Sequence, residues 1–147
     1  MNYGIFRNKT FTTSIPENLL SWDKSRFVIK GIFETDGSLY FSKSKTSCIH
    51  PSYPRLEIKT VSSKLAQQLY IILNKNYFKA KIRKNGSTWV IYLSGEDMLN
   101  KWVTEVGFGS KKNVSKLLLW RKLGYYIPKL TLPGRIALIS RKATKTI

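Results

Sequence analysis

Residues 29–41 read IKGIFETDGSLYF, and the hydrophobic period of the chain changes inside this stretch. Up to Asp36, apolar residues recur at three- and four-residue spacing from Ser21 onward, which predicts an amphipathic helix. From Ser38 to Lys45 apolar and polar residues alternate, which predicts a strand. Gly37 lies between the two and suits the left-handed turn that often ends a helix. The sequence therefore predicts a helix that is followed at once by the first strand of a sheet.

Two copies of a strand–strand–helix unit follow this first helix. Alternation predicts four strands, at residues 38–45, 55–61, 77–84 and 88–93. Asn85-Gly86 is a hairpin turn signal between the last two strands. Apolar residues at helical spacing predict further helices, at residues 63–75, 95–106, 111–123 and 135–142. The order α-β-β-α-β-β-α predicts an α+β fold, in which a four-stranded antiparallel sheet carries its helices on one face.

The length and composition are those of one globular domain. A chain of 147 residues with 42% hydrophobic residues has enough apolar surface for a single core. We expect an N-terminal arm at residues 1–20, the domain at 21–124 and a C-terminal extension at 125–147 that packs on it. No apolar run has the length of a membrane span, and residues 1–14 lack the core of a secretory signal. We therefore expect a soluble intracellular protein.

The charge of the chain is strongly unbalanced. It has 26 Lys and Arg against 8 Asp and Glu, which gives a formal net charge of +18 and a pI near 10.2. Like charges repel one another in the folded state, so a bound polyanion such as nucleic acid would stabilise the protein. Composition alone also fits a ribosomal protein or a basic soluble protein without such a partner.

A metal site of the cysteine–histidine type is excluded. Cys48 and His50 are the only residues of their types, so they cannot supply a tetrahedral ligand set or a disulfide within the chain. We place both in a surface loop between the first two strands. A metal ion must therefore be a hard cation that carboxylates bind, which makes the 8 acids the candidate ligands.

One face of the predicted sheet is polar and basic. Glu57 is the one acid among its outward positions, whereas an ordinary solvated face would mix both signs. We therefore expect this face to bind double-stranded DNA, with the strands in the major groove and the side chains on bases and phosphates. The expected contact residues are Tyr40, Ser42, Ser44, Arg55, Lys59, Lys79, Lys81, Arg83 and Tyr92.

Two acids, Glu34 and Asp36, lie in the last turn of the first predicted helix. The helix macrodipole makes this end unfavourable for carboxylates. In a chain with 8 acids, two at such a place fit a functional site. A solvated helix end explains the pair equally well when it is taken alone.

Residues 29–37 resemble the defining motif of the LAGLIDADG homing endonucleases. Gly31 matches the central glycine of that motif, Glu34 its first acid, Asp36 its last acid and Gly37 its closing glycine. The order and spacing of the elements also resemble the family over roughly residues 22–124, which is most of the chain.

The single copy of the motif supplies half of a family active site, so the resemblance implies a homodimer on a long near-palindromic target. The motif helices would pair at the two-fold axis beneath a concave sheet saddle that binds the DNA. Gly31 keeps the point of close approach, although Lys30 and Phe33 make the helix bulkier than in the family. The implied dimer interface consists of Phe27, Val28, Gly31, Ile32 and Thr35.

The resemblance further implies a metal-dependent, staggered double-strand break. Asp36 of each protomer would bind Mg²⁺ beside the scissile phosphate, with Mn²⁺ as a substitute and Ca²⁺ supporting binding without cleavage. Lys111 matches a family lysine that polarises water or screens charge, and Lys112 is its close rival and otherwise a DNA contact. Ser62 matches a glutamine that some members carry near the metal, at the end of the second strand. Glu34 would support the site without binding the metal.

Two other functions remain open. A family member can act as an RNA maturase that assists splicing, in which case host intron RNA is a partner. The chain can also be a DNA-binding regulator with an inactive site, although the intact Asp36 favours cutting. The resemblance implies an archaeal cytoplasm or an organelle matrix, in a mitochondrion or plastid, as the location.

Overall fold

A four-stranded antiparallel sheet with the strand order β1-β2-β4-β3 forms the centre of the computed structural model, which describes residues 13–141. The strands are β1 (Gly37–Ser42), β2 (Tyr53–Thr60), β3 (Lys81–Asn85) and β4 (Thr88–Ser94). The helices are η1 (Glu17–Leu19), α1 (Trp22–Asp36), α2 (Ser63–Lys75), α3 (Glu96–Glu105), α4 (Lys111–Leu123) and α5 (Leu132–Ser140). The predicted α+β fold is confirmed, and both strand–strand–helix units occur in the expected order.

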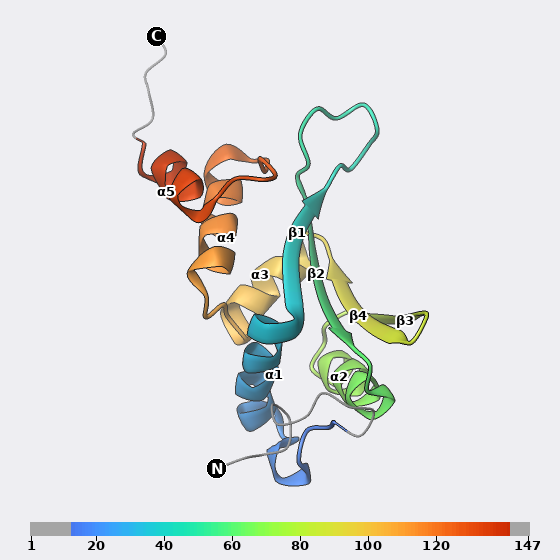
Figure 1. Ribbon diagram of the computed structural model, residues 1–147. Helices are drawn as coiled ribbons and strands as arrows, with labels where there is room; N and C mark the ends of the chain where they lie inside the picture. The colour runs from blue at the N-terminus through green and yellow to red at the C-terminus, as the bar shows by residue number, and fades with distance from the viewer. Residues whose placement is uncertain (1–12, 142–147) are drawn as a thin grey trace.

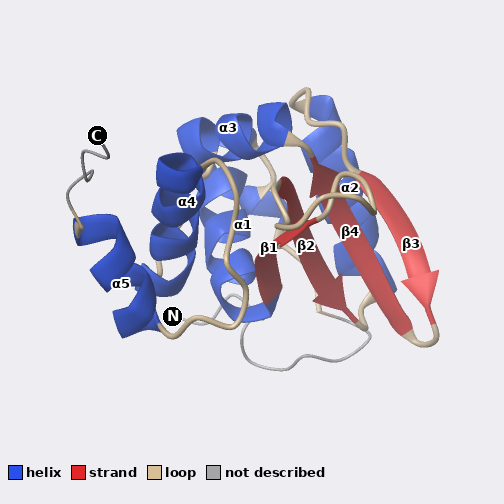
Figure 2. Cartoon of the chain, turned by 90° about the horizontal axis from the view of Figure 1, so that it is seen from above, coloured by secondary structure: helices blue, strands red, loops and turns tan. Residues whose placement is uncertain are grey.

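Helices α1, α2 and α3 pack against one face of the sheet, while α4 lies beside the β1 edge with α5 on its outer side (Figure 1 and Figure 2). The register pairs Leu39 with Leu56 and Leu56 with Leu93, so a row of apolar side chains crosses three strands. This row is buried in a core to which the helices contribute residues such as Phe33 and Trp102. The other face of the sheet is left to polar side chains.

Gly37 connects α1 to β1 without the left-handed turn expected from the sequence, so that expectation is wrong. Its φ of −101° and ψ of 168° are those of extended backbone. Gly37 instead lies against the last turn of α1, where a Cβ atom would come 2.6 Å from the Phe33 carbonyl oxygen. A residue without a side chain is needed here because the strand leaves the helix directly past Phe33.

β3 is shorter than the alternation predicts, because residues 77–80 form an irregular segment and the strand begins at Lys81. Tyr77 has a positive φ of 69°, which a strand does not accommodate. The side-chain amide of Asn74 donates to the Ala80 carbonyl at 3.1 Å and accepts from Ala80 N at 3.2 Å. These bonds occupy the backbone groups that a neighbouring strand would otherwise pair.

β1 is also shorter than predicted, since Ser42 is its last residue paired with β2. Ser44 therefore lies in the loop after β1, where its Oγ is 3.5 Å from Cys48 Sγ. Lys79 lies before β3. The expectation that Ser44 and Lys79 belong to the polar face of the sheet is wrong. His50, in the same loop as Ser44, stacks on Tyr125 with ring centroids 4.4 Å apart.

Both terminal segments pack on the domain in the part that the structure describes. The backbone of Ile15 is bound by the Gln68 side chain through hydrogen bonds of 2.7 and 3.1 Å. Tyr126 of the extension is buried and stacks on Phe41, with ring centroids 4.8 Å apart. The expected arm residues 1–12 and extension residues 142–147 lie outside the described residues. Within residues 13–141, no helix combines the length and the apolar character needed to cross a membrane.

Candidate functional site

Asp36 is the last residue of α1. A residue shortly before it and a residue shortly after it in the chain each form a hydrogen bond with α4. Before it, Glu34 Oε1 accepts a hydrogen bond from Asn113 Nδ2 at 3.3 Å. After it, Leu39 O accepts a hydrogen bond from Lys116 Nζ at 2.9 Å. The half-buried Asp36 therefore lies in the chain between two points of contact with α4.

Glu34 binds the start of α4 with both of its carboxylate oxygens. Besides the bond to Asn113, Oε2 accepts from Gly109 N at 2.9 Å, next to Ser110, the residue that caps α4. A carboxylate is unfavourable at the C-terminus of α1 and favourable at the N-terminus of α4, so the second placement offsets the first. These contacts fit the supporting role expected of Glu34, because they fix α4 against the end of α1.

The two lysines at the start of α4 face different neighbours. Lys112 precedes Lys116 by one helical turn, so both lie on the face of α4 that meets β1. Lys111 lines a cavity of about 300 Å³ between α4 and α5, together with apolar residues such as Leu118 and Ile136. Of the two rival lysines, Lys112 therefore lies toward β1 and Lys111 toward α5.

Ser62 is buried and caps α2, as the sequence allows for Ser62 or Ser63, and it follows the last residue of β2 by two positions. Its hydroxyl accepts from Leu65 N at 3.1 Å at the start of α2 and donates to the Thr13 carbonyl. β2 ends at Thr60, a half-buried residue whose hydroxyl accepts from Ser62 N at 3.1 Å. The last residue of β2 is therefore Thr60, two residues before Ser62.

One side of α1 carries most of the residues expected in a dimer interface. Phe27 is 62% exposed, Thr35 is exposed, and Val28 and Gly31 are half-buried. The Thr35 hydroxyl donates back to the Ile32 carbonyl at 3.0 Å. Ile32 itself is 1% exposed and packs in the core, so its assignment to the dimer interface is wrong. Adjacent residues of an α-helix point about 100° apart, so Ile32 can be buried in the core while Gly31 next to it is half-buried.

The carboxylate of Asp36 is of the type that binds Mg²⁺. Within residues 13–141, no three His, Cys, Asp or Glu side chains come together as a metal site. The site expected from the sequence takes one carboxylate from each of two copies, so a single chain contributes Asp36 alone. A metal ion on this chain would therefore depend on a second protomer for its other protein ligand.

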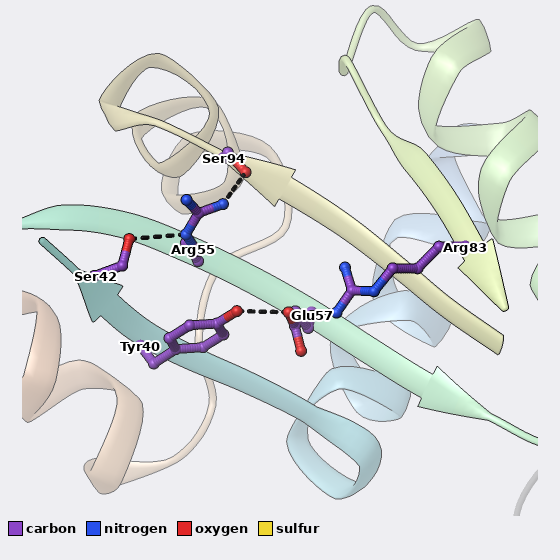
Figure 3. A network of polar contacts seen from close by, with 6 residues as sticks. All are labelled: Tyr40, Ser42, Arg55, Glu57, Arg83 and Ser94. Atoms are coloured by element: carbon purple, nitrogen blue, oxygen red, sulfur yellow. Dashed lines mark hydrogen bonds and ion pairs between the residues drawn. The ribbon is translucent and has the colours of Figure 1, made fainter. Parts of the chain in front are cut away.

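A polar network lies on the sheet face opposite α1, α2 and α3 (Figure 3). Glu57 is 7% exposed, and its Oε2 accepts hydrogen bonds from Tyr40 Oη at 2.6 Å and Arg83 Nη2 at 3.3 Å. Burial and the hydrogen bond to Glu57 raise the pKa of Tyr40, so the phenol stays protonated. The Arg83 guanidinium also lies over the Tyr92 ring, 4.7 Å from its centroid. The acid of this face is thus neutralised within the network.

Arg55 is held in place on the same face by two serines. Its Nε donates to Ser42 Oγ at 2.8 Å and its Nη1 to Ser94 Oγ at 3.2 Å, as Figure 3 shows. The guanidinium also lies 5.1 Å from the centroid of the Tyr53 ring. Fixing the side chain before binding reduces the entropy cost of a contact with an anion or a base. The sequence reasoning missed Ser94, which only the pairing of β2 with β4 brings opposite Arg55.

Four cations share this face with Glu57. Lys59, Lys81 and Arg83 are exposed, and Arg55 is half-buried. Positive charge interleaved with hydroxyl and aromatic side chains is typical of surfaces that bind phosphates and base edges. The structure therefore brings most of the predicted contact residues together on one face, and leaves out Ser44 and Lys79.

Two comparisons with known proteins find no relative of this chain. A scan of the chain against models of protein families finds no match, and a search among curated proteins finds none either. The evidence for a function therefore comes from the residues of this chain and from their arrangement.

Proposed function

We propose that this chain is a single-motif homing endonuclease of the LAGLIDADG type, which binds double-stranded DNA as a homodimer. It makes a metal-dependent, staggered double-strand break in a long near-palindromic target. The observation that carries the proposal is the attachment of α4 to the end of α1, where Asp36 lies, and to the start of β1. A carboxylate and an ammonium group beside a cationic sheet face suit the hydrolysis of a phosphodiester.

The proposed chemistry divides the work among three side chains. Asp36 of each protomer would hold a divalent cation, and Lys112 would screen the charge of the scissile phosphate. Glu34 is a positioning residue, because its bonds to Gly109 and Asn113 fix the start of α4. The bound cation supplies charge stabilisation and acidifies a water molecule. Mg²⁺ is the expected ion, Mn²⁺ substitutes for it, and Ca²⁺ supports binding without cleavage.

The homodimer would form through the side of α1 that carries Phe27, Gly31 and Thr35. Gly31 and Thr35 are one turn apart, and small residues at this spacing let two helix backbones approach closely. Phe27 and Val28 add apolar surface next to them. Because Asp36 ends the same helix, pairing α1 with its copy would bring the two carboxylates to a common axis.

Replacing Gly31 by leucine should weaken dimerisation about tenfold or more. The larger side chain forces the paired helices apart at a cost of about 1–3 kcal/mol, and each 1.4 kcal/mol is a factor of ten. Leucine is the better helix former, so α1 should remain folded. Sedimentation velocity on a palindromic duplex measures the effect. Gln67→Leu, which adds the same side chain to an exposed position of α2, is the control and should leave the dimer intact. A wild-type monomer on the full site would contradict the dimer.

Binding to DNA should depend steeply on salt. With about ten phosphate contacts per dimer, the slope of log K against log salt concentration should be near −9. Lys81→Ala removes an exposed cation of the sheet face from each protomer, so the slope should become shallower by about 1.8. Lys75→Ala, at an exposed position of α2, should change nothing. A slope near zero, or equal affinity for heparin, would count against a DNA-binding face.

The proposed activity implies a location in the cell, and two other binding results would indicate a different function. An intron-encoded nuclease acts where its host gene lies, in an archaeal cytoplasm or an organelle matrix. Tight binding to duplex DNA without any nick in Mg²⁺ or Mn²⁺ would indicate a DNA-binding regulator. Preferential binding to the folded host intron would indicate an RNA maturase.

A further inference from the structure

Three cationic side chains gather where α4, α5 and the outer edge of β1 meet, and we name Lys112, Lys116 and Arg135 the edge cation cluster. Lys116 Nζ donates to Leu39 O at 2.9 Å, which ties the half-buried ammonium to the edge of the sheet. Arg135 reaches the same region from α5, where its Nε donates to Ser115 Oγ at 2.8 Å. β1 ends the strand order on this side, so the cluster borders the sheet.

In the edge cation cluster, Lys116 and Arg135 donate hydrogen bonds to uncharged acceptors. Arg135 is 5% exposed, and its guanidinium donates to Ser115 Oγ and, at 2.6 Å, to the Leu130 carbonyl. Neither acceptor carries a charge. The charges that act on Lys116 are those of Lys112 on its own helix and Arg135 on α5, and both are positive. A buried cation is normally paired with an acid or a bound anion, so this arrangement calls for an anionic ligand.

Burial, followed by the charges of Lys112 and Arg135, lowers the pKa of Lys116 to about 8. Burial and the two neighbouring positive charges therefore disfavour the ammonium form of Lys116, and a negative charge bound beside it would favour that form. Lys116 has three N–H donors and gives one to Leu39 O, which leaves two for a ligand on its exposed side.

We propose that the edge cation cluster is a phosphate-binding site, which takes a backbone phosphodiester of the nucleic acid outside the sheet face. Lys116 contacts the phosphate, while Lys112 and the buried Arg135 contribute positive charge beside it. The inference rests on the proposed nucleic-acid function. It extends the contact surface beyond the strands, because the cluster continues the cationic face past the β1 edge. A polymer backbone that crosses the sheet reaches both sites together, whereas a free anion would occupy one of them alone.

The test compares wild type with Lys116→Gln and with Lys75→Gln, the latter at an exposed position of α2. Lys116→Gln should make the salt dependence of duplex binding shallower by about 1.8, since each protomer loses one phosphate contact worth about 0.9. Lys75→Gln should bind as wild type does. Equal slopes for wild type and Lys116→Gln would overturn the site and leave the DNA-binding proposal standing.

A proton linkage provides a second readout, because a phosphate binds the ammonium form of Lys116. Wild-type affinity should fall as the pH rises from 7 to 9.5. At pH 8 binding should take up about half a proton per protomer, measured by calorimetry in two buffers with different ionisation enthalpies. Lys116→Arg keeps the charge without titrating in this range, so it should keep the salt slope and lose the uptake. This variant also tests the site if Lys116→Gln fails to fold. Proton uptake that persists in Lys116→Arg would overturn the assignment.

A binding measurement with inorganic phosphate distinguishes the two possible sources of the ligand, a nucleic-acid backbone and a free anion. If wild type binds no duplex, the proposed function fails independently of the cluster. Phosphate binding that Lys116→Gln then abolishes would overturn the nucleic-acid source and assign the site to a free anion. Absence of both interactions would overturn the site itself.

Discussion

Replacing Asp36 by asparagine should abolish detectable cutting of a plasmid that carries the target. Asparagine keeps the shape of the side chain and removes the charge that would bind the cation. Loss of a carboxylate ligand costs about 4 kcal/mol of transition-state stabilisation, which is about a thousandfold in rate. Binding should survive and tighten slightly, because the change deletes a negative charge beside the DNA phosphates. A gel assay of supercoiled plasmid in Mg²⁺ measures the cutting.

Two controls separate chemistry from folding in this experiment. A binding titration in Ca²⁺ shows whether the Asp36→Asn protein still recognises the duplex. Glu34→Gln should reduce cutting less, since Glu34 holds Gly109 and Asn113 and is not expected to bind the cation. Cutting by Asp36→Asn at the wild-type rate would disprove its catalytic role. Joint loss of folding and affinity would make Asp36 a structural residue.

Replacing Gly37 by alanine should lower the free energy of unfolding by about 3 kcal/mol. The new Cβ would lie 2.6 Å from the Phe33 carbonyl oxygen, which cannot move without shifting the last turn of α1. Phe33 itself cannot yield, because it packs on Trp102 and Phe108 with ring centroids 5.1 and 5.7 Å apart. Thermal denaturation should show a midpoint lower by roughly 10 °C.

Gly109→Ala is the matched control for Gly37→Ala. A Cβ atom at Gly109 would meet Glu34 Cγ at 3.5 Å, which is ordinary van der Waals contact. Its stability should stay within about 0.5 kcal/mol of wild type. If Gly37→Ala melts with the wild type, the junction of α1 and β1 relaxes easily and the contact with Phe33 does not require a glycine.

The four strands could be predicted because one face of each is buried against the helices, which leaves a period of two in the sequence. The start of β3 could not be predicted in the same way. Phe78 and Ala80 are both buried and keep the alternation, although they lie in an irregular segment. What interrupts the strand is the amide of Asn74, and an amphipathic pattern contains no information about such a hydrogen bond.

Side-chain direction on the helices limited the prediction of the site. Lys111 and Lys112 point about 100° apart on α4, and the sequence does not show which of them faces β1. Ile32 was expected at the dimer interface, but its side chain is buried in the core. The capping role of Ser62 was predictable from its residue type before an apolar helical pattern, whereas the end of β2 at Thr60 was not, because pattern analysis gives such a boundary only to within a few residues. The place of Asp36 in the last turn of α1 was predictable, because the helical pattern runs up to Asp36-Gly37.

The most direct test of the proposed function is to incubate the wild-type protein with supercoiled plasmid that carries the uninterrupted insertion site of its own gene. Parallel reactions contain Mg²⁺, Mn²⁺ or Ca²⁺, and the products are separated on a gel and their ends sequenced. We expect linear DNA with staggered ends in Mg²⁺ and Mn²⁺, and bound but uncut plasmid in Ca²⁺. A site that is bound tightly and stays supercoiled with all three ions would contradict the proposal that this protein is an endonuclease.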